Sequence, residues 1–158
     1  MTVKPIPEGF EHATPYLTVS NAAEAAEWYT KAFGAVVTMT MPSPDGSKWM
    51  HGELKMLGSN IYIADSFPEM GGAKPPSEEE QAVSMHVYVE DVDAAFAKAV
   101  EAGATVKMPP TDMFWGDRFS KLRDPYGHTW SLATHIADPT PEEMAEAMKA
   151  MMSGDGCN

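Results

Sequence analysis

Apolar and polar residues alternate in two short segments of the chain, residues 13–19 (ATPYLTV) and 83–89 (VSMHVYV). This period of two is typical of a strand that is buried on one face. A polar residue, Asn21 or Asp91, stands two positions after each segment and can cap a helix. Apolar residues then recur at helical spacing. The pattern predicts a strand followed by a helix in each half of the chain, with the helices over 22–33 and 92–102.

The two halves are related by an offset of about 70 residues. Both helices are expected to end at a Gly-Ala pair, at Gly34 and Gly103, because glycine readily adopts the left-handed conformation that ends a helix. Residues 58–63 (GSNIYI) align with residues 127–132 (GHTWSL) at an offset of 69. Three agreeing registers indicate an internal duplication.

Turn residues divide the rest of each half into strands. The segments 43–46 (SPDG) and 124–127 (DPYG) both place proline at the second and glycine at the fourth position of a β-turn. The expected strands are 35–41, 48–56 and 60–65 in the first half, and 104–107, 117–123 and 128–134 in the second. Each half is therefore predicted to be a βαβββ module, and the fold class is α+β.

We interpret the chain as one domain, residues 1–158, with four parts. These are module one (12–65), a linker (66–81), module two (82–135) and a C-terminal helix (140–152). The linker is rich in Pro, Gly and Glu and has no periodicity, so we expect it to be mobile. The C-terminal helix has the residues of a capping box, Thr140 and Glu143. Its methionines form an apolar face that packs on the chain's own flank or covers a partner or the mouth of a groove.

Composition excludes several classes of protein. The 158 residues carry a formal net charge of −12, which disfavours nucleic acid as a partner. No apolar run approaches the 18 residues that a membrane helix needs, and residues 1–11 do not resemble a signal peptide. The single cysteine, Cys157, provides neither a disulfide framework nor a cysteine zinc site. We expect a cytoplasmic protein.

Several motifs resemble those of one superfamily. The residues PYL (15–17), WY (28–29) and FG (33–34) are similar to the first module of the glyoxalase/bleomycin resistance protein/extradiol dioxygenase (vicinal oxygen chelate) superfamily. The residues WGDR (115–118) and DPYGHTW (124–130) resemble its PhnB-like branch. The resemblance covers nearly the whole chain.

This resemblance implies eight strands curled into a half-barrel groove that holds a small molecule and is commonly completed in a homodimer. Superfamily members include metal-dependent isomerases, lyases and dioxygenases, and also metal-free proteins that sequester drugs. Because one fold hosts such different activities, the residues of the groove must decide the function.

The strand alternation identifies the side chains that line this groove. They are Thr14, Tyr16, Tyr62, Ser84, His86, Tyr88 and Ser131. By resemblance, metal-using relatives carry His or Gln on the first strand and Glu on the last strand of each module. Those four positions here hold Thr14, Tyr62, Ser84 and Ser131, none of which is a usual ligand of a divalent transition metal. We therefore expect no metal and no other cofactor.

A different polar group on the groove face leaves an alternative open. His51 and Glu53 lie two residues apart on one strand face, about 6.6 Å along the strand. They can form an acid/base pair, or, with His86 and a water, a substitute site for a divalent metal. They can equally be a hydrogen-bonded pair without a reaction.

The aromatic loop before residue 117 also has two interpretations. Trp115 and Arg118 can clamp a planar or anionic ligand at the groove edge. Alternatively, Trp115 fills the core and Arg118 pairs with Asp117 or Asp124. His135, near the end of the last strand, is interpreted as structural.

Three functions remain at this point. The leading hypothesis is a metal-free protein that binds a small, partly aromatic molecule. The alternative is a lyase or isomerase that uses His51, Glu53 and His86, with or without a divalent metal. A subunit or scaffold whose groove is filled by side chains is the third, and the sequence leaves open whether any reaction is catalysed.

Overall fold

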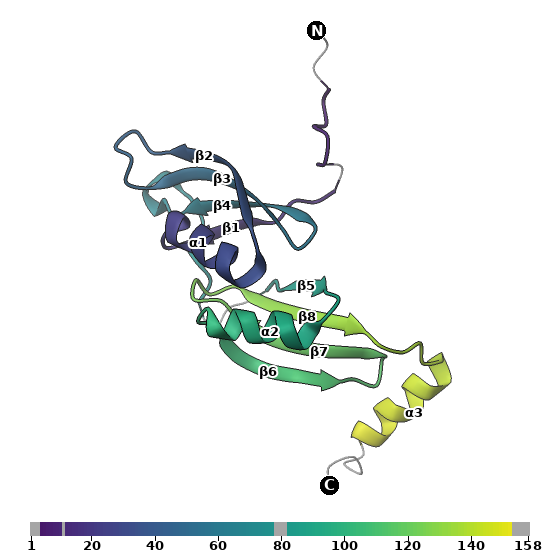
Figure 1. Cartoon of the computed structure of the whole chain (residues 1–158). Helices are drawn as coiled ribbons and strands as arrows, with labels where there is room; N and C mark the ends of the chain where they lie inside the picture. The colour runs from purple at the N-terminus through teal and green to yellow at the C-terminus, as the bar shows by residue number, and fades with distance from the viewer. Residues whose placement is uncertain (1–3, 11, 78–81, 153–158) are drawn as a thin grey trace.

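Two βαβββ modules follow one another in the computed structural model, which describes residues 4–10, 12–77 and 82–152 (Figure 1). Module one contains β1 (Tyr16–Val19), α1 (Ala22–Phe33), β2 (Val36–Pro42), β3 (Trp49–Met56) and β4 (Ser59–Asp65). Module two contains β5 (Met85–Tyr88), α2 (Val92–Glu101), β6 (Thr105–Asp112), β7 (Asp117–Arg123) and β8 (Thr129–His135). A short 3₁₀ helix, η1 (Pro68–Met70), lies in the predicted linker, and α3 (Pro141–Met152) follows module two.

The two sheets have the same topology, which confirms the predicted α+β fold and the duplication. The strand orders are β1-β4-β3-β2 and β5-β8-β7-β6. In each sheet the first strand runs parallel to the last, and the other pairs are antiparallel. The sheets are curled, but they do not close on each other.

Local signals in the sequence account for the helix ends. Asn21 and Asp91 each accept a hydrogen bond from the backbone N–H three residues on, at 3.2 and 2.9 Å. Gly34 ends α1 in the left-handed conformation, with φ of 69°. The repeat also extends to a pair not anticipated from the sequence. Asp65 and Thr134, 69 residues apart, each accept the first backbone N–H of the helix in their own module, at 3.0 and 2.9 Å.

The boundaries of several strands differ from those predicted. The first strand of each module is shorter than expected: β1 begins only after Pro15, and β5 begins at Met85. In contrast, β6 continues to Asp112 instead of ending at residue 107. It runs through Pro109 and Pro110, which an edge strand tolerates because one of its sides needs no N–H donors.

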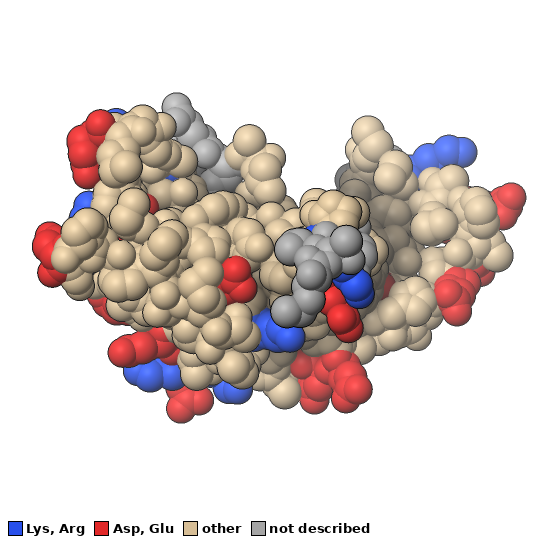
Figure 2. Space-filling model, turned by 90° about the horizontal axis from the view of Figure 1, so that it is seen from above, with Lys and Arg blue, Asp and Glu red and all other residues tan. Residues whose placement is uncertain are grey.

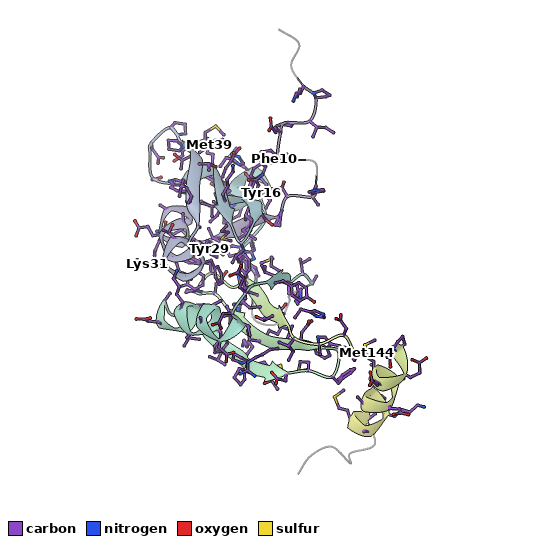
Figure 3. All side chains as sticks on the ribbon, turned by 45° about the vertical axis from the view of Figure 1, so that its right-hand side comes forward. Phe10, Tyr16, Tyr29, Lys31, Met39 and Met144 are labelled. Carbon is purple, nitrogen blue, oxygen red and sulfur yellow. The ribbon has the colours of Figure 1, made fainter. Side chains whose placement is uncertain are left out.

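An aromatic cluster joins the two modules. The buried side chains of Trp28 and Tyr29 from α1 face module two, and the rings of Phe33 and Trp130 lie 5.1 Å apart. Trp28 donates a hydrogen bond from Nε1 to the carbonyl of Ala102 at the end of α2 (2.7 Å). Figure 3 shows Tyr29 at this junction, away from Tyr16 on the outer part of module one. The core therefore lies on the helix side of the sheets and leaves their other faces open.

The C-terminal helix projects from the end of β8 (Figure 1). Its capping box is formed as predicted, with reciprocal hydrogen bonds between Thr140 and Glu143. None of the described α3 residues is buried, and Met148, Met151 and Met152 are 48, 60 and 81 % exposed. The methionine face does not pack on the chain's own flank. The alternative, that it covers a partner or the mouth of a groove, stays a prediction. Among the described residues, no helix is long and apolar enough to cross a membrane.

Candidate functional site

A hydrogen-bonded group lies on the open face of module one. The strand register places Tyr16 and Glu53 on either side of Tyr62. The Tyr16 hydroxyl lies 2.7 Å from Nδ1 of His51, and Nε2 of His51 lies 3.5 Å from Oε1 of Glu53. The Tyr62 ring meets the Tyr16 and His51 rings edge to face, with centroids 5.5 and 4.7 Å apart. The structure therefore brings together four of the residues that the sequence assigned to the groove.

This group is accessible to a ligand and can hold a proton. The His51 and Glu53 side chains are 16 and 27 % exposed, and Tyr16 is 54 % exposed. Partial burial, together with the neighbouring Tyr62 hydroxyl, raises the pKa of Tyr16, so it is a neutral hydrogen-bonding group at pH 7. The chain of contacts from Glu53 through His51 to Tyr16 has the order of a carboxylate, an imidazole and a hydroxyl. Such an arrangement can orient an imidazole for acid/base chemistry or fix it as a binding group.

The open face of module two is mainly aromatic. Nδ1 of His86 lies 3.0 Å from the Ser131 hydroxyl, and its ring stacks on Phe119 with the ring centroids 6.0 Å apart. Tyr88 meets His86 edge to face, and Trp115 meets Phe119 in the same way. This face offers flat apolar surfaces and hydroxyl groups, which suit a partly aromatic ligand.

A buried carboxylate on the same face was missed in the sequence analysis. Asp117 is 4 % exposed and accepts hydrogen bonds from the Tyr88 hydroxyl (2.9 Å) and from Nε1 of Trp115 (3.0 Å). Nδ1 of His135 contacts its other oxygen at 2.9 Å, and Nε2 of His135 contacts Asp138 at 3.0 Å. The predicted strand ended at residue 134. Continuing the alternation of Ser131 and Ala133 by one step would have placed His135 on the groove face.

The Asp117–His135 pair makes the stability of this end of the sheet depend on pH. Burial tends to raise the pKa of Asp117, but its hydrogen bonds from His135, Tyr88 and Trp115 outweigh burial and lower the pKa below 3.8. The hydrogen bonds with Asp117 and Asp138 raise the pKa of His135 above 6.5. The Asp117 contribution is present above pH 3.8 and is lost as pH falls. The His135 contribution is present below pH 6.5 and is lost as pH rises through the raised pKa.

We expect the His135→Gln variant to differ most from the wild type in melting temperature between pH 3.8 and 6.5, where both contributions are present.

We also expect Asp117→Asn to lower the pKa of His135 in an NMR titration, because the variant removes the negative charge beside Nδ1. An unchanged His135 pKa in Asp117→Asn would contradict this assignment. His128, whose Nε2 lies 3.0 Å from the Thr18 carbonyl, serves as an internal reference in the same spectra.

Arg118 lies on the opposite side of the sheet from the groove. Its guanidinium donates two hydrogen bonds to the Asp93 carboxylate on α2, at 2.6 and 2.8 Å, and one to Asp112 at 2.8 Å. The prediction that Arg118 clamps a ligand at the groove edge is therefore wrong, and so is the alternative that it pairs with Asp117 or Asp124. The alternation of β7 explains the difference, because residues 118, 120 and 122 face α2 when residue 117 faces the groove. Trp115 does not fill the core, since it is half-buried at the groove edge.

The four positions that the resemblance assigns to metal ligands carry side chains that suit a metal poorly. Thr14 and Ser84 lie just before β1 and β5, and Tyr62 and Ser131 lie on the last strands. Hydroxyl and phenol groups are weak ligands for divalent transition metals compared with imidazole and carboxylate. The substitute set is not assembled either. Within the part of the chain that the structure describes, no three His, Cys, Asp or Glu side chains could hold a metal ion. His51 and Glu53 belong to one sheet and His86 to the other.

Both groove faces have an open sheet edge. Among the described strands, β1 pairs only with β4, and β5 pairs only with β8. The carbonyls of Pro15 and Val19 accept hydrogen bonds from the β4 side, so the alternate residues Tyr16 and Thr18 direct their backbone groups to the other side of β1, where Nε2 of His128 from module two lies 3.0 Å from the Thr18 carbonyl. Figure 2 shows charged side chains around the periphery and a hollow between the body and α3 at the right. The two modules of one chain thus present two separate open sheet faces.

Duplicated βαβββ modules, each with a polar and aromatic open face, define a class of α+β proteins in which a curled sheet presents a groove. The chain belongs to the Glyoxalase/Bleomycin resistance protein/Dioxygenase superfamily, whose family model matches residues 9–132. It is 40 % identical over 146 residues to an uncharacterized protein of Mycobacterium bovis, and this match covers 90 % of the chain and 94 % of the relative.

Solved structures show the same architecture. TioX from Micromonospora sp. ML1 is similar with a TM-score of 0.61 and 26 % identity, over 80 % of this chain and 99 % of TioX. The PhnB protein from Bacillus cereus is similar in fold, with a TM-score of 0.58 and 19 % identity, over 78 % of this chain and 99 % of that protein. PhnB-like proteins are thus among its structural neighbours, as the sequence motifs indicated.

Proposed function

We propose that this protein binds a small, partly aromatic molecule on its groove faces without a metal ion. The observation that carries the proposal is which residues stand at the four positions that the resemblance assigns to metal ligands. Thr14, Tyr62, Ser84 and Ser131 supply hydroxyl groups, which hydrogen-bond an organic ligand better than they coordinate a divalent cation. The aromatic rings of both open faces support the same ligand class. A single cysteine in the sequence supports a reducing, cytoplasmic location.

A second copy of the chain is proposed to complete the groove. Among the strands that the structure describes, β1 and β5 have no strand partner on one edge, and such an edge is a template for pairing with another chain. Val36, Val37, Met39 and Met41 on β2 are also 40–60 % exposed, which is unusual for a monomer surface. In such a homodimer, module one of one copy would face module two of the other.

We expect sedimentation equilibrium to give a mass of about twice 17.2 kDa at micromolar concentration. The reason is that pairing two copies removes both kinds of open edge. A single 17.2 kDa species at all concentrations would contradict the homodimer. The ligand would then have to bind to the groove faces of a single chain.

The hydrogen-bonded group of module one favours a second candidate, a lyase or isomerase. The order Glu53, His51, Tyr16 holds the imidazole at both ring nitrogens and leaves the Tyr16 hydroxyl as the exposed end of the group. In that case His51 would transfer a proton to or from the ligand through the Tyr16 hydroxyl, with Glu53 stabilising the protonated imidazole. His86 lies in the other sheet of the chain, so it would act on this ligand from across the groove.

A fluorescence-detected screen of small aromatic compounds tests both candidates. For any ligand found, the binding proposal expects His51→Ala and Glu53→Ala to weaken binding and to leave the ligand chemically unchanged over time. Conversion of the ligand by the wild type, lost in both variants, would replace the binding proposal with the enzyme. If the screen found no ligand and side chains filled the groove of the dimer, a scaffold function would be favoured.

A further inference from the structure

A pocket of about 410 Å³ lies at the end of module one's open face. Tyr16 and Thr18 of β1 and Ala64 of β4 form its floor, and the register pairs Thr18 with Ala64. The chain leaves β4 and turns back, so that Phe67, Gly72 and Ala73 form the opposite wall. We call this space the linker pocket. Its volume is within the range that holds a small organic ligand.

The wall made by residues 66–73 is an ordered part of the fold. The Ser66 hydroxyl donates to the Ala73 carbonyl at 3.0 Å, and the Gly72 N–H donates to the Phe67 carbonyl at 3.0 Å. Nζ of Lys48 donates to the Ser66 carbonyl (3.0 Å) and lies 4.8 Å from the centre of the Phe67 ring. These contacts close the segment on itself and fix Phe67 against module one. This part of the predicted linker is therefore a hydrogen-bonded turn, and the mobility of the linker stays a prediction.

The chemistry of the linker pocket selects for an uncharged group. Asp65 borders it, but this carboxylate is 6 % exposed, and its oxygens accept the backbone N–H groups of Ala22 (3.0 Å) and Trp49 (2.7 Å). The described residues that line the pocket include no lysine, arginine or histidine. An anionic ligand would therefore be desolvated beside a carboxylate, with no cation among the described residues that line the pocket. A cation would find the oxygens of Asp65 already occupied.

We propose that the linker pocket binds an uncharged aromatic ring and that its one polar substituent meets the hydroxyl of Tyr16. This inference rests on the proposed small-molecule function and specifies its ligand class and position. The rings of Tyr16 and Phe67 provide apolar faces at either end of the pocket. The Tyr16 hydroxyl in turn contacts His51, which joins the linker pocket to the hydrogen-bonded group of module one.

The test compares 2-naphthol with 2-naphthoate at pH 7, because they share one ring system and differ in charge. We expect 2-naphthol to bind the full-length protein, as measured by its fluorescence, and 2-naphthoate to bind at least about tenfold more weakly. Ala64→Leu places a larger side chain on the pocket floor and should weaken 2-naphthol binding at least about tenfold. Ala145→Leu, the same substitution on exposed α3, is the matched control and should bind as the wild type does.

A second variant covers the case in which Ala64→Leu does not fold, which circular dichroism would show. Ala73→Trp fills the mouth of the pocket from an exposed loop position and should also weaken binding. Equal binding of 2-naphthol by the wild type and the folded pocket variants would overturn the location. In that case small-molecule binding elsewhere in the groove would still stand. Equal binding of 2-naphthoate, or no binding of 2-naphthol, would overturn the ligand class.

Discussion

Replacing Asp124 with alanine is expected to lower the free energy of unfolding by about 3–5 kcal/mol, because it removes a buried charge on which four donors converge. Asp124 is 3 % exposed. One oxygen accepts the Tyr29 hydroxyl at 2.6 Å and Nε1 of Trp130 at 2.9 Å. The other accepts the backbone N–H groups of Tyr126 and His128, both at 2.9 Å. Since Tyr29 belongs to module one, the variant loosens the junction between the modules as well as the turn at 124–127.

Urea unfolding followed by tryptophan fluorescence measures this loss. Asp138→Ala is the matched control, because the Asp138 side chain is 96 % exposed and solvent screens its contact with His135, so the variant should unfold much as the wild type does. A change of under about 1 kcal/mol in Asp124→Ala would contradict the role of this carboxylate at the junction.

Trp130→Ala is expected to cost about 3–5 kcal/mol, mainly because it leaves a cavity under the aromatic cluster. Trp130 is fully buried, and its ring lies 5.8 Å from that of Tyr29 and 5.1 Å from that of Phe33, by centroids. Both neighbours are on α1, so the loss affects the contact between the modules. The same urea experiment measures it.

Trp130→Phe separates packing from hydrogen bonding, because phenylalanine keeps a ring but cannot donate to Asp124. We expect this variant to lose about 1–3 kcal/mol, less than Trp130→Ala. The double variant Asp124→Ala/Trp130→Ala should lose less than the sum of the single variants, since both remove the same hydrogen bond. Strict additivity would show that the two residues act independently.

Short-range signals explain why the fold could be predicted. The caps at Asn21 and Asp91, the turn glycines and the alternation along β3 and β4 are properties of neighbouring residues, and these are formed as predicted. The strand ends were less well predicted. The length of β6 depends on its pairing with β7, and a local pattern of residues does not indicate how far that pairing extends.

The candidate site was predictable in part for the same reason. Alternation along β3 placed His51 and Glu53 on one face, but their contact with Tyr16 depends on which strands are neighbours. The partners of Arg118 and Asp117 come from other elements, and Tyr29 and Asp124 are 95 residues apart. Such long-range contacts follow from the packing of the modules, and a local pattern of residues identifies at most the face on which each partner lies.

The metal content of the dialysed protein is the most direct test of the proposed metal-independent binding. The protein is to be purified without chelator, shown to bind its groove ligand, and then subjected to elemental analysis. We expect Zn, Ni, Mn and Fe together to be below about 0.1 atom per chain, with ligand binding unchanged, because hydroxyl groups occupy the positions of the metal ligands. About one atom of any of these metals per chain, retained on dialysis and required for ligand binding, would contradict the account.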